Sequence, residues 1–284
     1  MSTELRLGGP IFDTPNDPEE LARAHLTCGY RAAYCPEVSL SNKNRIREIR
    51  RAFKKYDVLI AEVGAWRNLI SVNNSEQKKN FKYVCERLAL ADEIGANCCV
   101  DSIGTLDPDS SFGPYPDNLS RATFELMVDT VRQVLDEVKP GRTKFALEMM
   151  QWIFPDSVDS YVELIHAVDR SSFGVHMDPV NLIVSPRLYF DNGALIRECF
   201  QKMGKWIVSC HAKDIVLRNK LSLHLDEVRP GLGNLNYRTY LTELNRLPGE
   251  VPIMLEHLSS AEEYTMARDY LFCLGKELGI KFGE

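Results

Sequence analysis

Residues 173–179 read FGVHMDP, an apolar run that ends in an aspartate followed by a proline. Aromatic and β-branched residues favour a strand, and the proline favours a turn directly after it. The pattern recurs at residues 144–149, KFALEM, and at residues 207–213, IVSCHAK. Each of these segments therefore predicts a short buried strand that ends in a ligand-type side chain.

The same alternation of short strand patterns and longer helical patterns extends outward through the whole chain. We expect strands at Leu5–Gly9, Ala32–Cys35, Val58–Val63, Asn97–Ser102, Lys144–Met149, Phe173–Asp178, Ile207–Lys213 and Pro252–Glu256. We expect helices at Asp17–Cys28, Asn42–Tyr56, Ser75–Ile94, Asn118–Val138, Val158–Val168, Gly193–Met203, Tyr237–Leu247 and Ala261–Leu278. Eight successive β/α units predict an α/β fold, a single (β/α)8 TIM barrel.

The length and the turn residues agree with this architecture. The chain has 284 residues, and a barrel of this kind uses about 250 residues as one unit, so we expect one domain over residues 1–284. Asp17-Pro18 places a capping carboxylate before a first-turn proline, and glycines follow helices as C-terminal caps would, at Gly29, Gly95 and Gly204. The loops Gly104–Asp117 and Ile215–Asn236 would follow strands, where barrel enzymes build their active sites.

Composition limits the class of partner. The formal net charge is -6, and the one basic stretch, Lys43–Lys55, has the spacing of an amphipathic helix with a solvated face, so no nucleic acid is expected. No run of about 18 apolar residues occurs, so no membrane contact is expected. The lack of a signal peptide and of any C-x-x-C pair favours a cytoplasmic protein with reduced thiols and a small-molecule partner. A homo-oligomer fits these features, although none identifies an interface.

Four predicted strand ends carry ligand-type side chains: Glu148, Asp178, His211 and Glu256. Their separations of 30, 33 and 45 residues suit consecutive β-α-β units, so all four should meet at one rim of the barrel. A lone carboxylate at a strand end often caps a helix instead. Three carboxylates and an imidazole together, however, would repel and be desolvated unless a cation lay between them. The set therefore predicts a divalent metal, Mn2+ or Mg2+ first, with Co2+ and Zn2+ possible.

Six motifs can be compared with known families: AEVGAW at 61–66, ALE at 146–148, HMDPVN at 176–181, HAKD at 211–214, PGLGNLNY at 230–237 and LEH at 255–257. In this order and spacing the chain resembles the xylose isomerase-like barrel superfamily, particularly its sugar-phosphate isomerase/epimerase and ketose 3-epimerase branch. The resemblance covers nearly the whole chain and is clearest in the second half.

The resemblance implies that Glu148, Asp178, His211 and Glu256 are the metal ligands, and that Glu148 and Glu256 are also the acid/base pair. One glutamate would remove a proton next to a carbonyl, and the other would return it from the opposite face. The cation would stabilise the enediolate formed between the two steps. The implied activity is a metal-dependent isomerase or epimerase that acts on a ketose or related keto-polyol.

Two positions depart from the ketose 3-epimerase pattern. Asn181 stands where that family has a substrate-binding histidine, and Phe154 stands where it has a second glutamate. The sugar is therefore not specified by the resemblance.

Further side chains are expected near the substrate. His176 and Lys213 share a strand face with the ligands two residues away, and they should contact substrate or, alternatively, form a buried hydrogen bond and an ion pair. The other expected substrate-binding residues are Glu62, Trp66, Asn181 and Arg229. Trp152 and Phe154 would form an apolar wall or pack in the core. His257 should point toward the helices, by alternation from Glu256.

Three other functions remain open. An inosose-type dehydratase would use the same metal and the same first proton abstraction. A metal-dependent phosphodiesterase similar to the AP endonucleases would need more metal ligands than this set provides. A barrel that only binds a ligand would have no need of the complete ligand set.

Overall fold

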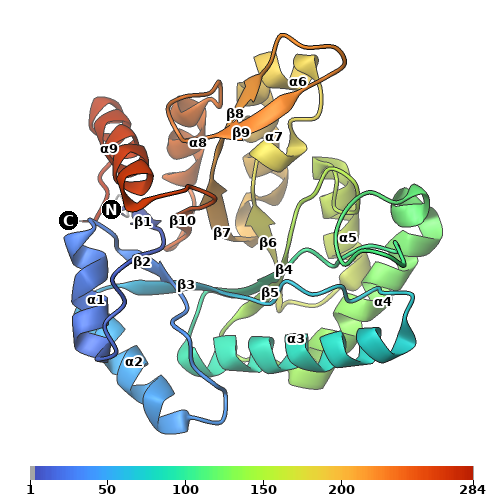
Figure 1. Ribbon diagram of the computed structural model, residues 1–284, viewed down its shortest axis with the longest axis horizontal. Coiled ribbons are helices and arrows are strands. Elements are labelled where there is room, and N and C mark those ends of the chain that lie inside the picture. The colour runs from blue at the N-terminus through green and yellow to red at the C-terminus, as the bar shows by residue number, and fades with distance from the viewer. Residues whose placement is uncertain (1–3, 284) are drawn as a thin grey trace.

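The computed structural model describes residues 4–283, and its strands close into a barrel surrounded by helices (Figure 1). The eight parallel barrel strands are β1 (Arg6–Gly8), β2 (Ala32–Tyr34), β3 (Leu59–Gly64), β4 (Cys98–Asp101), β5 (Lys144–Glu148), β6 (Phe173–Met177), β7 (Ile207–Ala212) and β10 (Pro252–Leu255). Their order around the barrel follows the sequence, and β10 pairs with β1 to close it. The predicted (β/α)8 barrel is confirmed.

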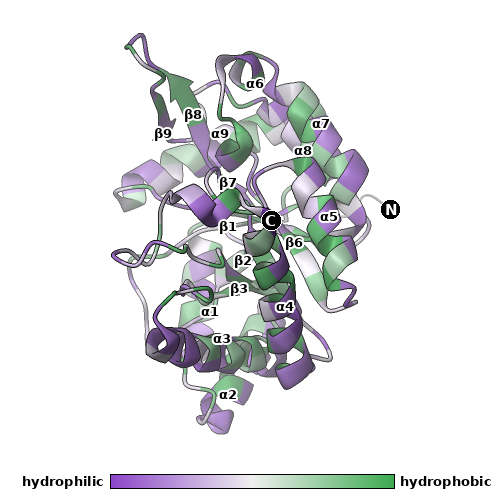
Figure 2. Ribbon diagram, turned by 90° about the vertical axis from the view of Figure 1, so that its right-hand side faces the viewer, coloured by the Kyte–Doolittle hydropathy of each residue, from purple (hydrophilic) through white to green (hydrophobic). Residues whose placement is uncertain are grey.

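The helices that cover the barrel are α1 (Pro18–Thr27), α2 (Lys43–Lys55), α3 (Asn74–Ile94), α4 (Arg121–Val138), α5 (Val158–Val168), α6 (Pro186–Phe190), α7 (Asn192–Met203), α8 (Tyr237–Leu244) and α9 (Ala261–Leu278). They carry hydrophobic and hydrophilic residues together, as amphipathic helices between core and solvent do (Figure 2). No helix in residues 4–283 has the length and apolar character needed to cross a bilayer. The eight cysteines, all within that range, are free thiols, as expected.

Two of the predicted helix ends have the capping residues that the local sequence indicates. Asp17 caps α1, because its side chain accepts hydrogen bonds from the backbone N–H groups of Glu19 and Glu20. Gly95 ends α3 in the left-handed conformation at φ 80°. Gly204 is the C-cap of α7, as predicted, but its φ of -48° is right-handed and the chain continues into a short 3-10 helix.

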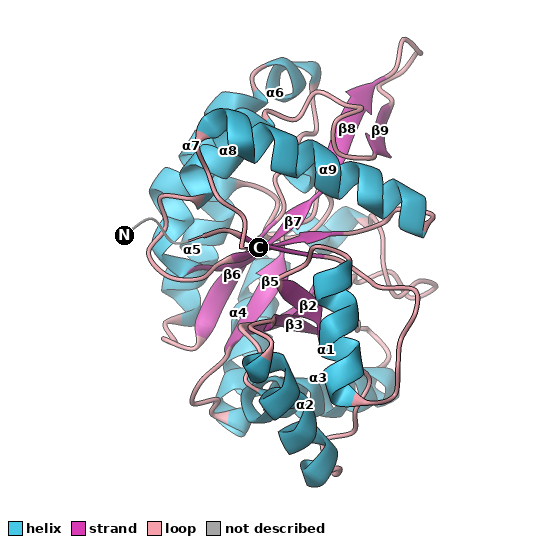
Figure 3. Cartoon of the chain, turned by 90° about the vertical axis from the view of Figure 1, so that its left-hand side faces the viewer, coloured by secondary structure: helices cyan, strands magenta, loops and turns pink. Residues whose placement is uncertain are grey.

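The region after β7 differs most from the prediction. The expected loop contains an antiparallel hairpin of β8 (Asp214–Leu217) and β9 (Leu225–Val228), which projects from the barrel (Figure 3). Asp214 fixes the chain beyond it by accepting backbone hydrogen bonds from Gly231, Gly233 and Leu235. A Cβ atom on Gly233 would lie 2.3 Å from the Asp214 carboxylate, so only glycine fits there.

The structure also divides one predicted helix and adds a short one. The segment Asn118–Val138 is broken at Ser120, whose extended backbone separates a 3-10 turn, Pro116–Leu119, from α4. The side chain of Ser120 caps α4 by accepting from the backbone N–H of Thr123. The short helix α6 was not predicted, because five residues are too few for a helical period to be recognised.

Candidate metal centre and active site

The four predicted ligands lie together at the carboxyl ends of β5, β6, β7 and β10. Glu148 is the last residue of β5, and His211 lies in β7. Asp178 and Glu256 each follow directly after a strand, β6 and β10. Because the strands are parallel and adjacent, their carboxyl ends bring all four side chains to one end of the barrel.

Buried tyrosines of the surrounding helices hold these strand ends. The hydroxyl of Tyr161 on α5 donates to the carbonyl of Leu147, directly before Glu148. The hydroxyl of Tyr240 on α8 donates to the carbonyl of His211 over 2.9 Å. The backbone at two ligand positions is thus fixed by hydrogen bonds that the barrel ladder does not supply.

The side chains converge on one nitrogen of His211. Its Nδ1 lies 2.7 Å from Glu256 Oε1, 2.9 Å from Glu148 Oε1 and 3.9 Å from Asp178 Oδ2. One ligand atom from each of the four residues lies within 4.8 Å of the other three. Carboxylate oxygens with one imidazole nitrogen at this separation fit a hard divalent cation such as Mn2+ or Mg2+. We call these three carboxylates the rim cluster.

Lys213 lies within the rim cluster and is itself buried. Its Nζ is 2.6 Å from Glu256 Oε1, 2.7 Å from Asp178 Oδ2 and 3.7 Å from Glu148 Oε1. Asp178 Oδ2 and Glu256 Oε1 are both buried, and neither accepts a well-directed hydrogen bond. Only ionic contacts therefore offset the cost of burying these two oxygens. The rim cluster therefore offers more acceptors than its two cationic neighbours can satisfy.

The charges of the rim cluster shift the pKa values of its members. Burial lowers the pKa of His211, but Glu256, Glu62 and Glu148 raise it, and the net pKa lies well above the usual value. Burial raises the pKa of Glu148, but His211 and Lys213 bring it down to about 2. Burial together with the neighbouring carboxylates raises the pKa of Asp178 to about 6, against the effect of Lys213.

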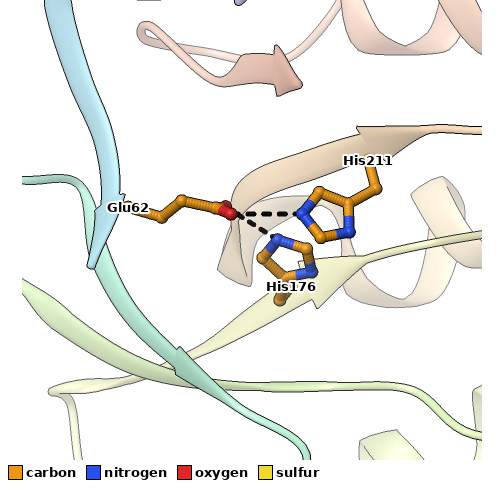
Figure 4. Close-up of side chains that lie close together, drawn as sticks. All are labelled: Glu62, His176 and His211. Carbon is orange, nitrogen blue, oxygen red and sulfur yellow. Dashed lines mark hydrogen bonds and ion pairs between the residues drawn. The ribbon is translucent and has the colours of Figure 1, made fainter. Parts of the chain in front are cut away.

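A second group of ligand-type residues lies on the other side of the His211 ring, deeper in the barrel. Glu62 of β3 has Oε1 3.1 Å from His211 Nε2, and its Oε2 is 2.9 Å from His176 Nε2 (Figure 4). The hydroxyl of Ser209 donates to the same Oε2 over 3.0 Å. We call Glu62, His176 and Ser209 the floor cluster. Each is at most 2% exposed.

A cavity of about 1080 Å³ opens onto the rim cluster. Six of the predicted site residues line it: Glu62, Trp66, Glu148, Asn181, Lys213 and Glu256. Asn181 is fixed there by donating to the carbonyl of Met149 over 3.1 Å. Glu62 is only 2% exposed there, and both of its oxygens are already hydrogen-bonded.

Two predicted substrate-binding residues lie outside the cavity. His176 is fully buried, and its Nε2 is occupied by Glu62, which matches the hydrogen-bonded alternative for this residue. Arg229 forms an ion pair with Glu263 of α9 at 3.0 Å and does not line the cavity. A direct contact of either side chain with a substrate would require it to leave these partners.

Trp66 stands at the cavity wall in an unusual backbone conformation. Its φ is 49°, in the left-handed region, and its side chain is 42% exposed. A Cβ atom on Gly64 would lie 2.3 Å from the indole nitrogen, so the ring can cross the backbone only because residue 64 is glycine. Such strain is concentrated at binding sites.

The two other aromatic residues expected at the apolar wall are separated. Trp152 also lines the cavity, whereas Phe154 packs against Phe124 in the core.

The sequence-based orientation of His257 is wrong. Its φ of 59° breaks the strand alternation after Glu256, so the imidazole lines the cavity and contacts Glu227 of β9 at 3.1 Å. Glu227 was missed as a cavity residue because the hairpin was not predicted. Histidine adopts a positive φ more often than most residues do, but it does not require one, so the sequence alone does not indicate this conformation.

Residues 27–272 match the family described as the xylose isomerase-like TIM barrel. The chain belongs to this family. A search of curated proteins found no match.

Solved structures show the same fold at low sequence identity. A xylose isomerase-like TIM barrel protein from Mycobacterium smegmatis, in complex with magnesium, is 19% identical with a TM-score of 0.67, over 92% of this chain and 89% of that one. The 3-keto-D-glucoside 4-epimerase of E. coli is 14% identical with a TM-score of 0.66, over 95% and 100%. An L-ribulose 3-epimerase is 11% identical with a TM-score of 0.71, over 98% and 96%. The structural neighbours thus include sugar epimerases.

Proposed function

We propose that this chain is a divalent-metal-dependent sugar isomerase or epimerase that removes and returns a proton next to a carbonyl. The observation on which the proposal depends is the rim cluster, in which Glu148 and Glu256 both contact His211 Nδ1 and line a cavity. Glu148, Asp178, His211 and Glu256 would hold the metal. When bound, the cation would stabilise negative charge on the substrate oxygens next to the carbon that loses its proton.

The two glutamates are in the ionised state that a proton acceptor requires. The pKa of Glu148 is about 2, and the pKa of Glu256 is also lowered, since His211 and Lys213 outweigh the effect of burial. Both carboxylates are therefore ionised at neutral pH and can accept a proton. Lys213 lies between them and lines the cavity, where its ammonium group can donate hydrogen bonds to a substrate oxygen.

The floor cluster makes a hydrolase with several metals a weaker proposal. Glu62 and His176 would be the nearest further ligands, but both are buried and hydrogen-bonded to each other. An inosose-type dehydratase is the second candidate, because it would use the same metal ligands and Asn181 departs from the ketose 3-epimerase pattern. This side chain lines the cavity in place of the histidine that ketose 3-epimerases use for their substrate.

The test is deuterium incorporation in D2O with Mn2+ and a panel of ketoses and inososes. We expect exchange at the carbon next to the carbonyl of at least one ketose, with an epimer or isomer as the product. An inosose that loses water after exchange would instead establish the dehydratase. If metal-loaded protein gave no exchange with any of these sugars, the proposal would be wrong.

A further inference from the structure

Glu62 lies on the opposite side of the His211 ring from the proposed metal. Hydrogen-bond donors from His211, His176 and Ser209 all meet its carboxylate, at 3.1, 2.9 and 3.0 Å. Figure 4 shows both imidazole rings directing a nitrogen toward this one group. Residues on β3, β6 and β7 are thus joined through one buried side chain.

This contact determines which nitrogen of His211 carries a proton when a metal is bound. An ionised carboxylate can only accept hydrogen bonds, so His211 must present Nε2–H to Glu62. A neutral ring then has its lone pair on Nδ1, the atom that faces Glu148 and Glu256. Metal-bound histidines are commonly held in this way, by a hydrogen bond from the other ring nitrogen.

The floor cluster also prevents Glu62 from turning away. Ser209 and His176 both bond Oε2, which leaves Oε1 for His211. The two imidazole rings pack edge to face with their centres 4.1 Å apart, so neither ring can rotate without displacing the other.

We propose that Glu62 is a positioning residue that fixes the tautomer and the ring orientation of His211 from the buried side of the barrel. The inference rests on the metal-dependent function proposed above. It assigns Glu62 and His176 to support of the metal centre, in place of the direct substrate contact expected from the sequence.

The same residues have to be considered as a second cation site, since ligand atoms of Glu62, His176 and His211 lie within 4.8 Å of one another. A second ion would have only three protein ligands, fewer than the four or more coordination positions that these metals fill, and all three side chains are buried. It would also have to replace the hydrogen bonds on both imidazoles. We therefore expect one tightly bound ion per chain.

The experiment compares the wild-type protein with Glu62→Gln and with Asp101→Asn as the matched control. Asp101 is an equally buried carboxylate on the neighbouring strand β4, and it accepts backbone hydrogen bonds without contacting His211. Mn2+ is titrated into each metal-free protein to measure affinity and stoichiometry. Long-range 1H–15N spectra of the Mg2+-loaded proteins report which nitrogen of His211 is protonated.

We expect one ion per wild-type chain and a proton on Nε2. Glu62→Gln should bind Mn2+ about 10- to 100-fold more weakly, because the new amide group can donate to Nε2 and favour the tautomer with a proton on Nδ1. Asp101→Asn should bind Mn2+ with wild-type affinity.

Unchanged Mn2+ affinity in Glu62→Gln, with the proton still on Nε2, would overturn the positioning role and leave the proposed activity untouched. Two ions per wild-type chain would overturn it as well. If Glu62→Gln does not fold, the wild-type spectrum decides, because a proton on Nδ1 contradicts the proposal. Normal metal binding without exchange on any sugar would refute only the proposed activity, whereas a wild-type chain that binds no divalent ion would refute both.

Discussion

The rim cluster and the floor cluster lie on opposite sides of the His211 imidazole. They differ in how many hydrogen-bond donors are available for each carboxylate. On the rim, three carboxylates share His211 Nδ1 and one ammonium group, that of Lys213. On the floor, one carboxylate, Glu62, receives three donors. The rim cluster has an excess of negative charge, and the floor cluster does not.

This difference shows that residue type alone does not identify a metal site. Together with His211, the rim carboxylates bring potential ligand atoms within 4.8 Å of one another, and so do Glu62 and His176 on the floor. Only the rim cluster has acceptors in excess of donors and an opening to a cavity. A buried carboxylate whose oxygens are all bonded has little to gain from a cation, whereas crowded carboxylates are stabilised by one.

The largest effect should follow from removing a proton acceptor at the rim. We expect Glu256→Gln to lower the exchange rate by about 10²- to 10⁴-fold, the usual contribution of a general acid or base. Deuterium exchange on an authentic substrate at saturating metal measures it. Glu263→Gln, which alters the Arg229 ion pair outside the cavity, is the control and should exchange at the wild-type rate. An unchanged rate in Glu256→Gln would remove the acid/base role from the rim cluster.

A smaller but clear difference should separate the two histidines. We expect His211→Ala to weaken Mn2+ binding by at least about 100-fold, because it deletes a ligand. His176→Gln should weaken it by less than about tenfold, since the amide can still donate to Glu62 and the effect of such supporting contacts is indirect. Titration calorimetry measures both. Equal losses in the two variants would mean that the floor cluster binds the ion as well.

The sequence was sufficient to predict the barrel and the rim cluster, because both follow from simple periodicity. Buried parallel strands appear as short apolar runs, and the end of each run is the position that faces the active site. Glu148, Asp178 and His211 are recognisable from this position alone. Their meeting at one point needs only the order of the strands, which in a barrel is the order of the sequence.

The features that the sequence did not predict depend on contacts or conformations that hydrophobic periodicity does not encode. The hairpin β8–β9 is held by Asp214 through backbone groups about twenty residues away. His257 enters the cavity through a positive φ, and Arg229 leaves it for Glu263. The donors that surround Glu62 come from two other strands, and so a floor cluster can be recognised only from coordinates.

The smallest effect should be a pH dependence of metal binding. It should show that His211 loses the proton on Nδ1 and keeps the proton on Nε2 when a metal binds. Burial lowers the pKa of this ring, but Glu256 and Glu62 raise it well above the usual value, so the metal-free ring carries both protons at pH 7. A metal requires the lone pair of Nδ1, and each ion bound should therefore release one proton.

Mn2+ affinity should accordingly rise with pH, by up to about tenfold per pH unit, as long as the metal-free ring carries the second proton. Near and below pH 6 the slope should steepen, because Asp178, with a pKa of about 6, must also lose a proton before it can bind the ion. Calorimetry in buffers of different ionisation enthalpy counts the released protons. An affinity independent of pH would mean that the free ring is already neutral. If the ring released two protons per ion above pH 6.5, Nε2 would have been deprotonated as well and would not keep the proton that it donates to Glu62.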